Sequence, residues 1–158
     1  MRSAIVVLVT AAALGVSACG ATTRTSAVQT RAMPTLTSAT ATFVSLEDGK
    51  DANSELTVQL LRNNAELGAE LRSVGTEFDD NASSAPLAFS LSGPFTMQDL
   101  DTGQVRIRLT PDGNDDWTFD LRLTTRFSDG STRDFLWRSV RLDRTNPERV
   151  LTFAGARL

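Results

Sequence analysis

The sequence predicts an all-β protein that folds as a single antiparallel β-sandwich of about eight strands. Apolar and polar residues alternate strictly from Val105 to Leu109 and again from Trp117 to Leu123, which is the period of a strand with one buried face. Turn-forming clusters of Gly, Asp, Asn and Ser separate such segments along the chain. Only residues 63–74 show apolar spacing that is compatible with a helix, and a strand is the preferred prediction there.

The expected strands follow one another with turn residues between them. They are residues 41–46, 56–60, 70–76, 87–91, 105–109, 117–123, 135–142 and 150–153. The turn Ser128-Asp129-Gly130 joins two of them and is the best hairpin signal in the chain. One helical turn is expected from Phe95 to Leu100.

The N-terminus is typical of a secretory signal peptide, which we assign to residues 1–18. Its apolar stretch is shorter than the roughly 20 helical residues that span a bilayer. The stretch ends in "VSAC" (16–19), which resembles a bacterial lipobox, where the cysteine becomes the lipidated first residue of the mature chain. Cys19 is the only cysteine and so has no internal disulfide partner. We therefore expect acyl chains such as palmitate at Cys19; an ordinary signal peptide with an incidental cysteine is the alternative.

The mature chain has room for one domain and not two. Residues 19–40 are rich in Thr, Ser and Ala without apolar periodicity, and we expect a flexible tether between the lipid and the fold. Residues 41–158 then form the sandwich. This arrangement predicts a lipoprotein that is anchored in a membrane of the bacterial cell envelope and faces the periplasm or the exterior.

Charge and composition exclude several classes of function. The net charge is −3 with no basic block, so nucleic acid is not an expected partner. The chain has 0 histidines, which excludes serine–histidine and cysteine–histidine catalysis. Lys50, the single lysine, lies in an acidic loop that should keep it charged and unreactive. We expect no enzyme, although a hydrolase built on two carboxylates is an alternative.

Three acidic clusters fall between the expected strands: Glu47/Asp48/Asp51, Glu77/Asp79/Asp80 and Asp112/Asp115/Asp116. Calcium takes six to eight oxygen ligands, often from several loops, and the loops of a sandwich gather at its ends. Ordinary solvated turns are the alternative explanation of the same residues. An EF-hand is excluded at 112–123, because Trp117 stands where glycine is required and Leu123 where the bidentate glutamate belongs.

Several segments, in order, resemble the PLAT (lipoxygenase-homology) domain family. They are "KDANSELTVQLL" (50–61), "TEFDDN" (76–81), "GQVRIRL" (103–109), "DDWTFDLRL" (115–123) and "DFLWRSVRLD" (134–143). Lys50 replaces the usual threonine before Asp-Ala-Asn, the closing tryptophan is displaced, and residues 144–158 have no counterpart in the family pattern.

The PLAT resemblance implies a β-sandwich that targets or binds other molecules, in some members with calcium. Carried over residue by residue, the implied calcium ligands are Asp48, Asp51, Asn53, Asp79, Asp80 and Asp116, with Asp112 and Asp115 as additions. It also implies that Trp117 caps the core and that Trp137 is a core residue. We expect non-catalytic binding of an envelope protein, lipid or glycan, with calcium as a candidate cofactor; a structural or assembly lipoprotein without metal is the alternative.

Overall fold

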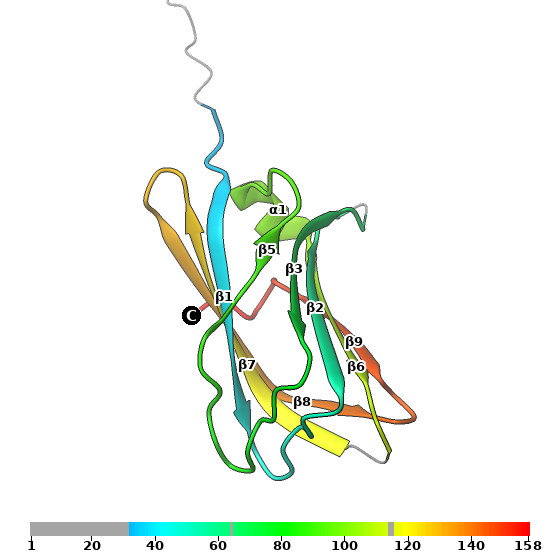
Figure 1. The fold of residues 1–158 in the computed structure, drawn as a ribbon. Helices are drawn as coiled ribbons and strands as arrows, with labels where there is room; N and C mark the ends of the chain where they lie inside the picture. The colour runs from blue at the N-terminus through cyan, green and yellow to red at the C-terminus, as the bar shows by residue number, and fades with distance from the viewer. Residues whose placement is uncertain (1–31, 64, 114–115) are drawn as a thin grey trace, which may run out of the picture. The chain divides into compact units, whose positions relative to one another are not determined.

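The computed structural model describes residues 32–63, 65–113 and 116–158. The predicted signal peptide, Cys19 and most of the predicted tether lie outside the described residues, as does Asp115. The described part of the chain contains nine β-strands and one short helix. Two antiparallel sheets pack face to face, which confirms the predicted all-β sandwich (Figure 1).

The first sheet has the strand order β4-β1-β7-β8. Its strands are β1 (Leu36–Ser45), β4 (Leu87–Ala88), β7 (Asp116–Phe127) and β8 (Thr132–Asp143). The turn at residues 128–131 joins β7 to β8, as predicted, and Gly130 adopts a φ of 83° there, a conformation that glycine reaches without steric cost.

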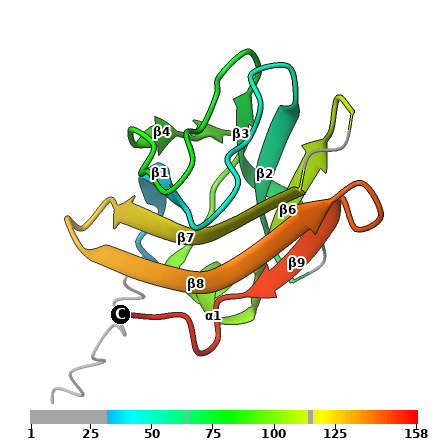
Figure 2. The ribbon, with the colours of Figure 1, turned by 90° about the horizontal axis from the view of Figure 1, so that it is seen from below.

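The second sheet has the strand order β5-β3-β2-β6-β9. Its strands are β2 (Glu55–Leu61), β3 (Leu67–Ser73), β5 (Ser90–Leu91), β6 (Gln104–Thr110) and β9 (Glu148–Thr152). Because β8 and β9 are consecutive in the chain but belong to different sheets, their connection crosses from one layer of the sandwich to the other (Figure 2).

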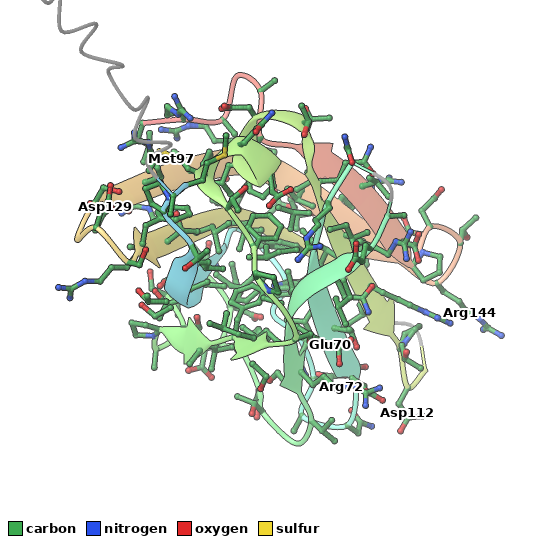
Figure 3. All side chains as sticks on the ribbon, turned by 90° about the horizontal axis from the view of Figure 1, so that it is seen from above. Glu70, Arg72, Met97, Asp112, Asp129 and Arg144 are labelled. Atoms are coloured by element: carbon green, nitrogen blue, oxygen red, sulfur yellow. The ribbon has the colours of Figure 1, made fainter. Side chains whose placement is uncertain are left out.

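Alternation in the sequence places one apolar row of each strand in the space between the sheets. In β6 the buried residues are Val105, Ile107 and Leu109, and they meet the buried row of β7, which begins with Trp117 and Phe119. The outer face of β3 is polar, and Figure 3 shows Glu70 and Arg72 there, with 3.7 Å between Arg72 Nε and Glu70 Oε1. These strands thus have one solvent-exposed polar face and one buried apolar face, as predicted.

Helix α1 (Met97–Thr102) overlaps the helical turn predicted at residues 95–100, but it begins and ends two residues later. Thr96 caps its first turn, because its hydroxyl accepts the N–H of Asp99 while the Asp99 carboxylate accepts the N–H of Thr96. This reciprocal pair satisfies two backbone donors that a helix start otherwise leaves without partners. Leu100 anchors the helix in the core.

Some strand boundaries differ from those predicted. β1 begins at Leu36, inside the segment that the composition predicted to be a tether, because Leu36 is buried and its N–H bonds to the carbonyl oxygen of Phe95 at 2.6 Å. The single strand expected at 87–91 is two short strands, since the chain passes from the first sheet to the second at Phe89. Both differences depend on partners distant in the sequence.

Candidate functional site

Loops that carry the predicted acidic clusters meet at one end of the sandwich. The amide of Gly49 donates to Oδ1 of Asp80 at 2.6 Å, which joins the first cluster to the second. Nδ2 of Asn53 donates to Oδ2 of Asp112 at 2.7 Å, which joins the first loop to the third. We call these described segments, residues 46–54, 77–82 and 111–113, the loop end (Figure 1).

Several of the implied calcium ligands are already engaged by donors. Asp80 and Asp112 accept the hydrogen bonds just described, and Oδ1 of Asp116 accepts Nε of Arg141 at 2.9 Å. The other implied ligands in the described part of the chain are exposed; they are Asp48, Asp51, Asn53 and Asp79. Figure 3 shows Asp112 at the rim of its loop.

No three acidic, histidine or cysteine side chains within the described residues lie close enough together to hold a metal ion. A calcium ion needs six to eight oxygens within about 2.6 Å. Asp115 lies outside the described residues, and calcium binding by this chain stays a prediction.

The loop end instead contains a cation that belongs to the chain. Lys50 is fully buried, and its Nζ donates to the carbonyl oxygens of Asp51 at 2.7 Å and Ser54 at 2.6 Å. Nζ also lies 5.4 Å from the centroid of the Phe78 ring, within reach of a cation–π interaction. Carbonyl oxygens are ligands that calcium also uses, so Lys50 supplies a positive charge where the sequence suggested a metal ion.

Close contact between two loops fixes the position of Lys50. The backbone N–H of Lys50 donates to the carbonyl oxygen of Phe78 at 3.0 Å, and the N–H of Phe78 donates back at 2.9 Å. A Cβ atom at position 49 would collide with that carbonyl oxygen, so the preceding residue, Gly49, allows the two backbones to approach.

Trp117 closes the core beneath the loop end, as predicted. The residue is completely buried, and its ring centroid lies 5.3 Å from that of Phe43 and 5.3 Å from that of Phe78. Its indole Nε1 donates to Oγ of Ser45 at 3.0 Å. Trp117 thus links the loop end to the core. Because its side chain is completely buried, it does not present a surface for insertion into a membrane.

A second feature, which the sequence did not indicate, lies between the edges of the two sheets. Figure 2 shows β8 and β9 running side by side. An open groove of about 730 Å³ lies between these two strands. We call it the β8–β9 groove; it is lined by residues 136–138 and 140 of β8, residues 150–152 of β9 and residues 154–158. Its volume is within the range of about 300–1,000 Å³ that is usual for small-ligand sites.

Trp137 spans the groove and corrects the prediction that it is a core residue. It is only partly buried, and its indole Nε1 donates across to the carbonyl oxygen of Thr152 in β9 at 2.9 Å. Its ring stacks on Phe135, with the centroids 5.8 Å apart and the planes 17° from parallel. The groove therefore has an aromatic surface held in a fixed orientation.

A β-bulge shapes the wall of the groove. Phe119 pairs with Val140 and Leu121 pairs with Trp137, so β8 has one more residue than β7 over this interval. Ser139 takes up the difference with a φ of 52°, and its N–H donates to Oδ1 of Asp120 at 2.9 Å. Such a conformation costs a non-glycine residue about 1–3 kcal/mol and tends to occur at functional positions.

The charged residues of the groove are basic. Arg138 and Arg157 line it, and no aspartate or glutamate is among its described lining residues. Both arginines have partners outside the groove: Arg138 lies 3.8 Å from Asp120, and Arg157 lies 3.2 Å from Asp101. The side chain of Arg138 is 75% exposed, so it remains accessible to a ligand.

One sequence signal could have located the bulge. Phe135 and Trp137 are two residues apart, as are Val140 and Leu142, but Val140 comes three residues after Trp137, so the period of two is interrupted by a single residue after Trp137. An added residue in an alternating strand indicates a bulge, and bulges occur often at sheet edges and near binding sites. No local feature of the sequence indicates that β9 is the strand that faces this segment.

The chain matches no protein-family model and no curated protein sequence. The resemblance to PLAT domains therefore stays a prediction. Of what it implies, the structure shows the β-sandwich fold. Among the described residues, no helix has the length and apolar character needed to cross a membrane. Cys19, the predicted lipidation site, lies outside those residues.

Proposed function

We propose that this chain is a non-catalytic binding lipoprotein of the bacterial cell envelope, anchored at Cys19, whose ligand binds in the β8–β9 groove. The observation that carries the proposal is the open groove of about 730 Å³ with the partly buried indole of Trp137 across it. Ligand sites usually combine aromatic or apolar side chains with a few oriented polar groups, and the groove has both kinds of group.

The chemistry of the chain favours binding over catalysis. Without histidine, the chain lacks the commonest general base, and no aspartate or glutamate side chain is among the described lining residues of the groove. An aromatic ring, two arginines and backbone groups at the sheet edges can bind and orient a ligand, but they do not make a general acid–base pair. The ligand belongs to one of the expected classes: an envelope protein, a lipid or a glycan.

A metal-free version of this function is favoured by Lys50. Its buried amine already bonds to two carbonyl oxygens of the loop end, so these loops have a cation that does not depend on calcium supply. In this version the loop end stabilises the sandwich and the groove alone binds the partner. A purely structural or assembly lipoprotein is the remaining candidate, and it predicts no specific ligand for the groove.

Tryptophan fluorescence tests the proposal. The full chain with Cys19→Ser would be titrated with envelope glycans, phospholipid vesicles and soluble peptides, alongside Trp137→Phe and, as a matched control, Val74→Ser, whose residue is 69% exposed. We expect one class to change the emission of the parent chain and the control. The same class should bind Trp137→Phe at least tenfold more weakly, measured by calorimetry because this variant lacks the reporting indole. Equal binding to Trp137→Phe would place the site elsewhere, and no binding by any class would favour the structural candidate.

A further inference from the structure

We infer that the β8–β9 groove binds an extended, acidic peptide segment that pairs as an added strand with the free edge of β8. This inference rests on the proposed function and names the class of partner. Three independent features carry it: an open strand edge, a segment of the chain that already pairs with part of that edge, and the charge of the groove.

The open edge is the outer side of β8. β8 is the last strand of its sheet and pairs with β7 on its inner side only. Along residues 137–142, no described strand pairs with the outer side. Unpaired N–H and C=O groups on a sheet edge are a template for another extended chain.

The residues near the C-terminal end show that this edge accepts an antiparallel partner. The N–H of Leu136 donates to the carbonyl oxygen of Ala156 at 2.8 Å, and the N–H of Leu158 donates to the carbonyl oxygen of Asp134 at 3.0 Å. Phe135 and Arg157 form an antiparallel bridge. These contacts occupy only the first part of the edge, and the groove continues the same line towards Asp143.

The side chains of the groove define the chemistry of the peptide. Arg138 and Arg157 favour carboxylates, since no acidic side chain is among the described lining residues. Trp137 and Leu151 offer apolar surface for the alternate side chains of an extended segment. The preferred partner therefore has acidic residues and apolar residues at a spacing of two.

An acyl chain fits these features less well than a peptide does. It can cover Trp137, but it cannot supply donors and acceptors for the edge of β8. A peptide backbone presents both at the period of the strand. The bulge at Ser139 limits regular pairing to short stretches on either side, so we expect a short segment.

The test begins with a displayed library of random octapeptides, selected on the full chain with Cys19→Ser. Enriched peptides would be synthesised and their affinity measured by fluorescence anisotropy for the parent chain, for Arg138→Glu and for Arg144→Glu. Arg144 is a matched control, because it is an exposed arginine in the β8–β9 turn and is not a lining residue of the groove (Figure 3). We expect Arg138→Glu to weaken binding at least tenfold and Arg144→Glu to change it less than twofold.

Backbone N-methylation then tests strand pairing itself. In an added strand, alternate peptide N–H groups face β8, so methylating one alternate set should abolish binding while methylating the other should leave it nearly unchanged. Equal tolerance of both sets would overturn the inference, as would a selection that enriches no peptide. If a glycan or lipid binds in a Trp137-dependent way while no peptide does, the inference fails and the proposed function stands. If nothing depends on Trp137, both fail.

Discussion

Nζ of Lys50 lies 2.6 Å from the carbonyl oxygen of Ser54, inside a loop end whose acidic residues suggested a metal site. The chain contains one lysine among its 16 basic residues, and among the basic residues that the structure describes this lysine is the one completely buried. An ammonium group can donate in three directions and can approach carbonyl oxygens closely, whereas the flat guanidinium of arginine is larger and has a fixed geometry. Lysine is thus suited to a small site lined by carbonyl oxygens.

The first prediction concerns this buried amine. Lys50→Met keeps most of the volume but removes the donors, and leaving two carbonyl oxygens without them should lower the free energy of unfolding by about 2–4 kcal/mol. Urea denaturation would measure the loss, with the exposed Arg144→Met as control. In Lys50→Ala, methylammonium chloride should restore part of the thermal stability, while sodium chloride at equal ionic strength should not. A Lys50→Met chain as stable as the parent would contradict this role.

The second prediction concerns calcium. Because Lys50 already provides a cation and no described group of three ligands is present, we expect millimolar calcium to leave the melting temperature unchanged. A calcium site filled at about 100 times its Kd would instead add roughly 2.7 kcal/mol, which calorimetry and a thermal shift would both detect. Such a shift, abolished by Asp79→Asn, would establish the calcium prediction made from the sequence.

A third prediction tests the coupling of Trp117 to the strand below the loop end. Ser45→Ala removes the acceptor of the buried indole N–H, so we expect a loss of about 1–3 kcal/mol in the free energy of unfolding. Ser92→Ala, at an exposed position, serves as the control. The emission of Trp117 should also change in the folded state, because its N–H loses its partner. An unchanged unfolding curve would mean that the indole finds another acceptor.

Alternation predicted much of the fold because it records which face of each strand is buried. Where it is strict, as in Val105–Leu109 and Trp117–Leu123, the expected strand and its buried row are both present. Boundaries were less predictable, since Leu36 joins β1 through its pairing with Phe127 of β7 and its hydrogen bond to Phe95. Local sequence does not encode such contacts.

The candidate sites could be predicted only in part, for a similar reason. The acidic turns do meet, but whether Asp80 and Asp112 face a metal or accept hydrogen bonds depends on Gly49 and Asn53 across the loops. Trp137 has the pattern of a core residue, and it lines a groove because β9 lies in the other sheet. Both outcomes arise from tertiary packing.

A fourth prediction addresses the membrane anchor. If Cys19 is lipidated, cells fed a clickable fatty acid should label the chain, and Cys19→Ser should remove both the label and the association with the membrane fraction. Thr22→Ser, a polar substitution nearby, is the control for expression and processing. Equal labelling of the Cys19→Ser chain would show that the cysteine is incidental to an ordinary signal peptide.

The fifth prediction links pH to the turn that connects β8 to β9. Oδ1 of Asp143 accepts the N–H of Asn146 at 2.7 Å and that of Thr145 at 2.8 Å. These hydrogen bonds, with that from Asn146 the largest cause, hold the pKa of Asp143 below its usual value of 3.8. A carboxyl whose pKa is lowered by folding contributes stability above its unfolded pKa and loses it as the pH falls through the folded pKa.

We therefore expect the stability contributed by Asp143 to be present at neutral pH and to be lost as the pH falls below 3.8. Asp143→Asn keeps an oxygen acceptor for the turn but cannot titrate, so its free energy of unfolding should fall less steeply over this acid range than that of the parent chain. Ser92→Ala, at an exposed position without a titrating side chain, is the control and should follow the parent curve. Urea unfolding at a series of pH values gives the comparison, and ¹³C NMR gives the carboxyl titration directly. Identical pH dependence in the parent and Asp143→Asn chains would show that this turn does not couple protonation to folding.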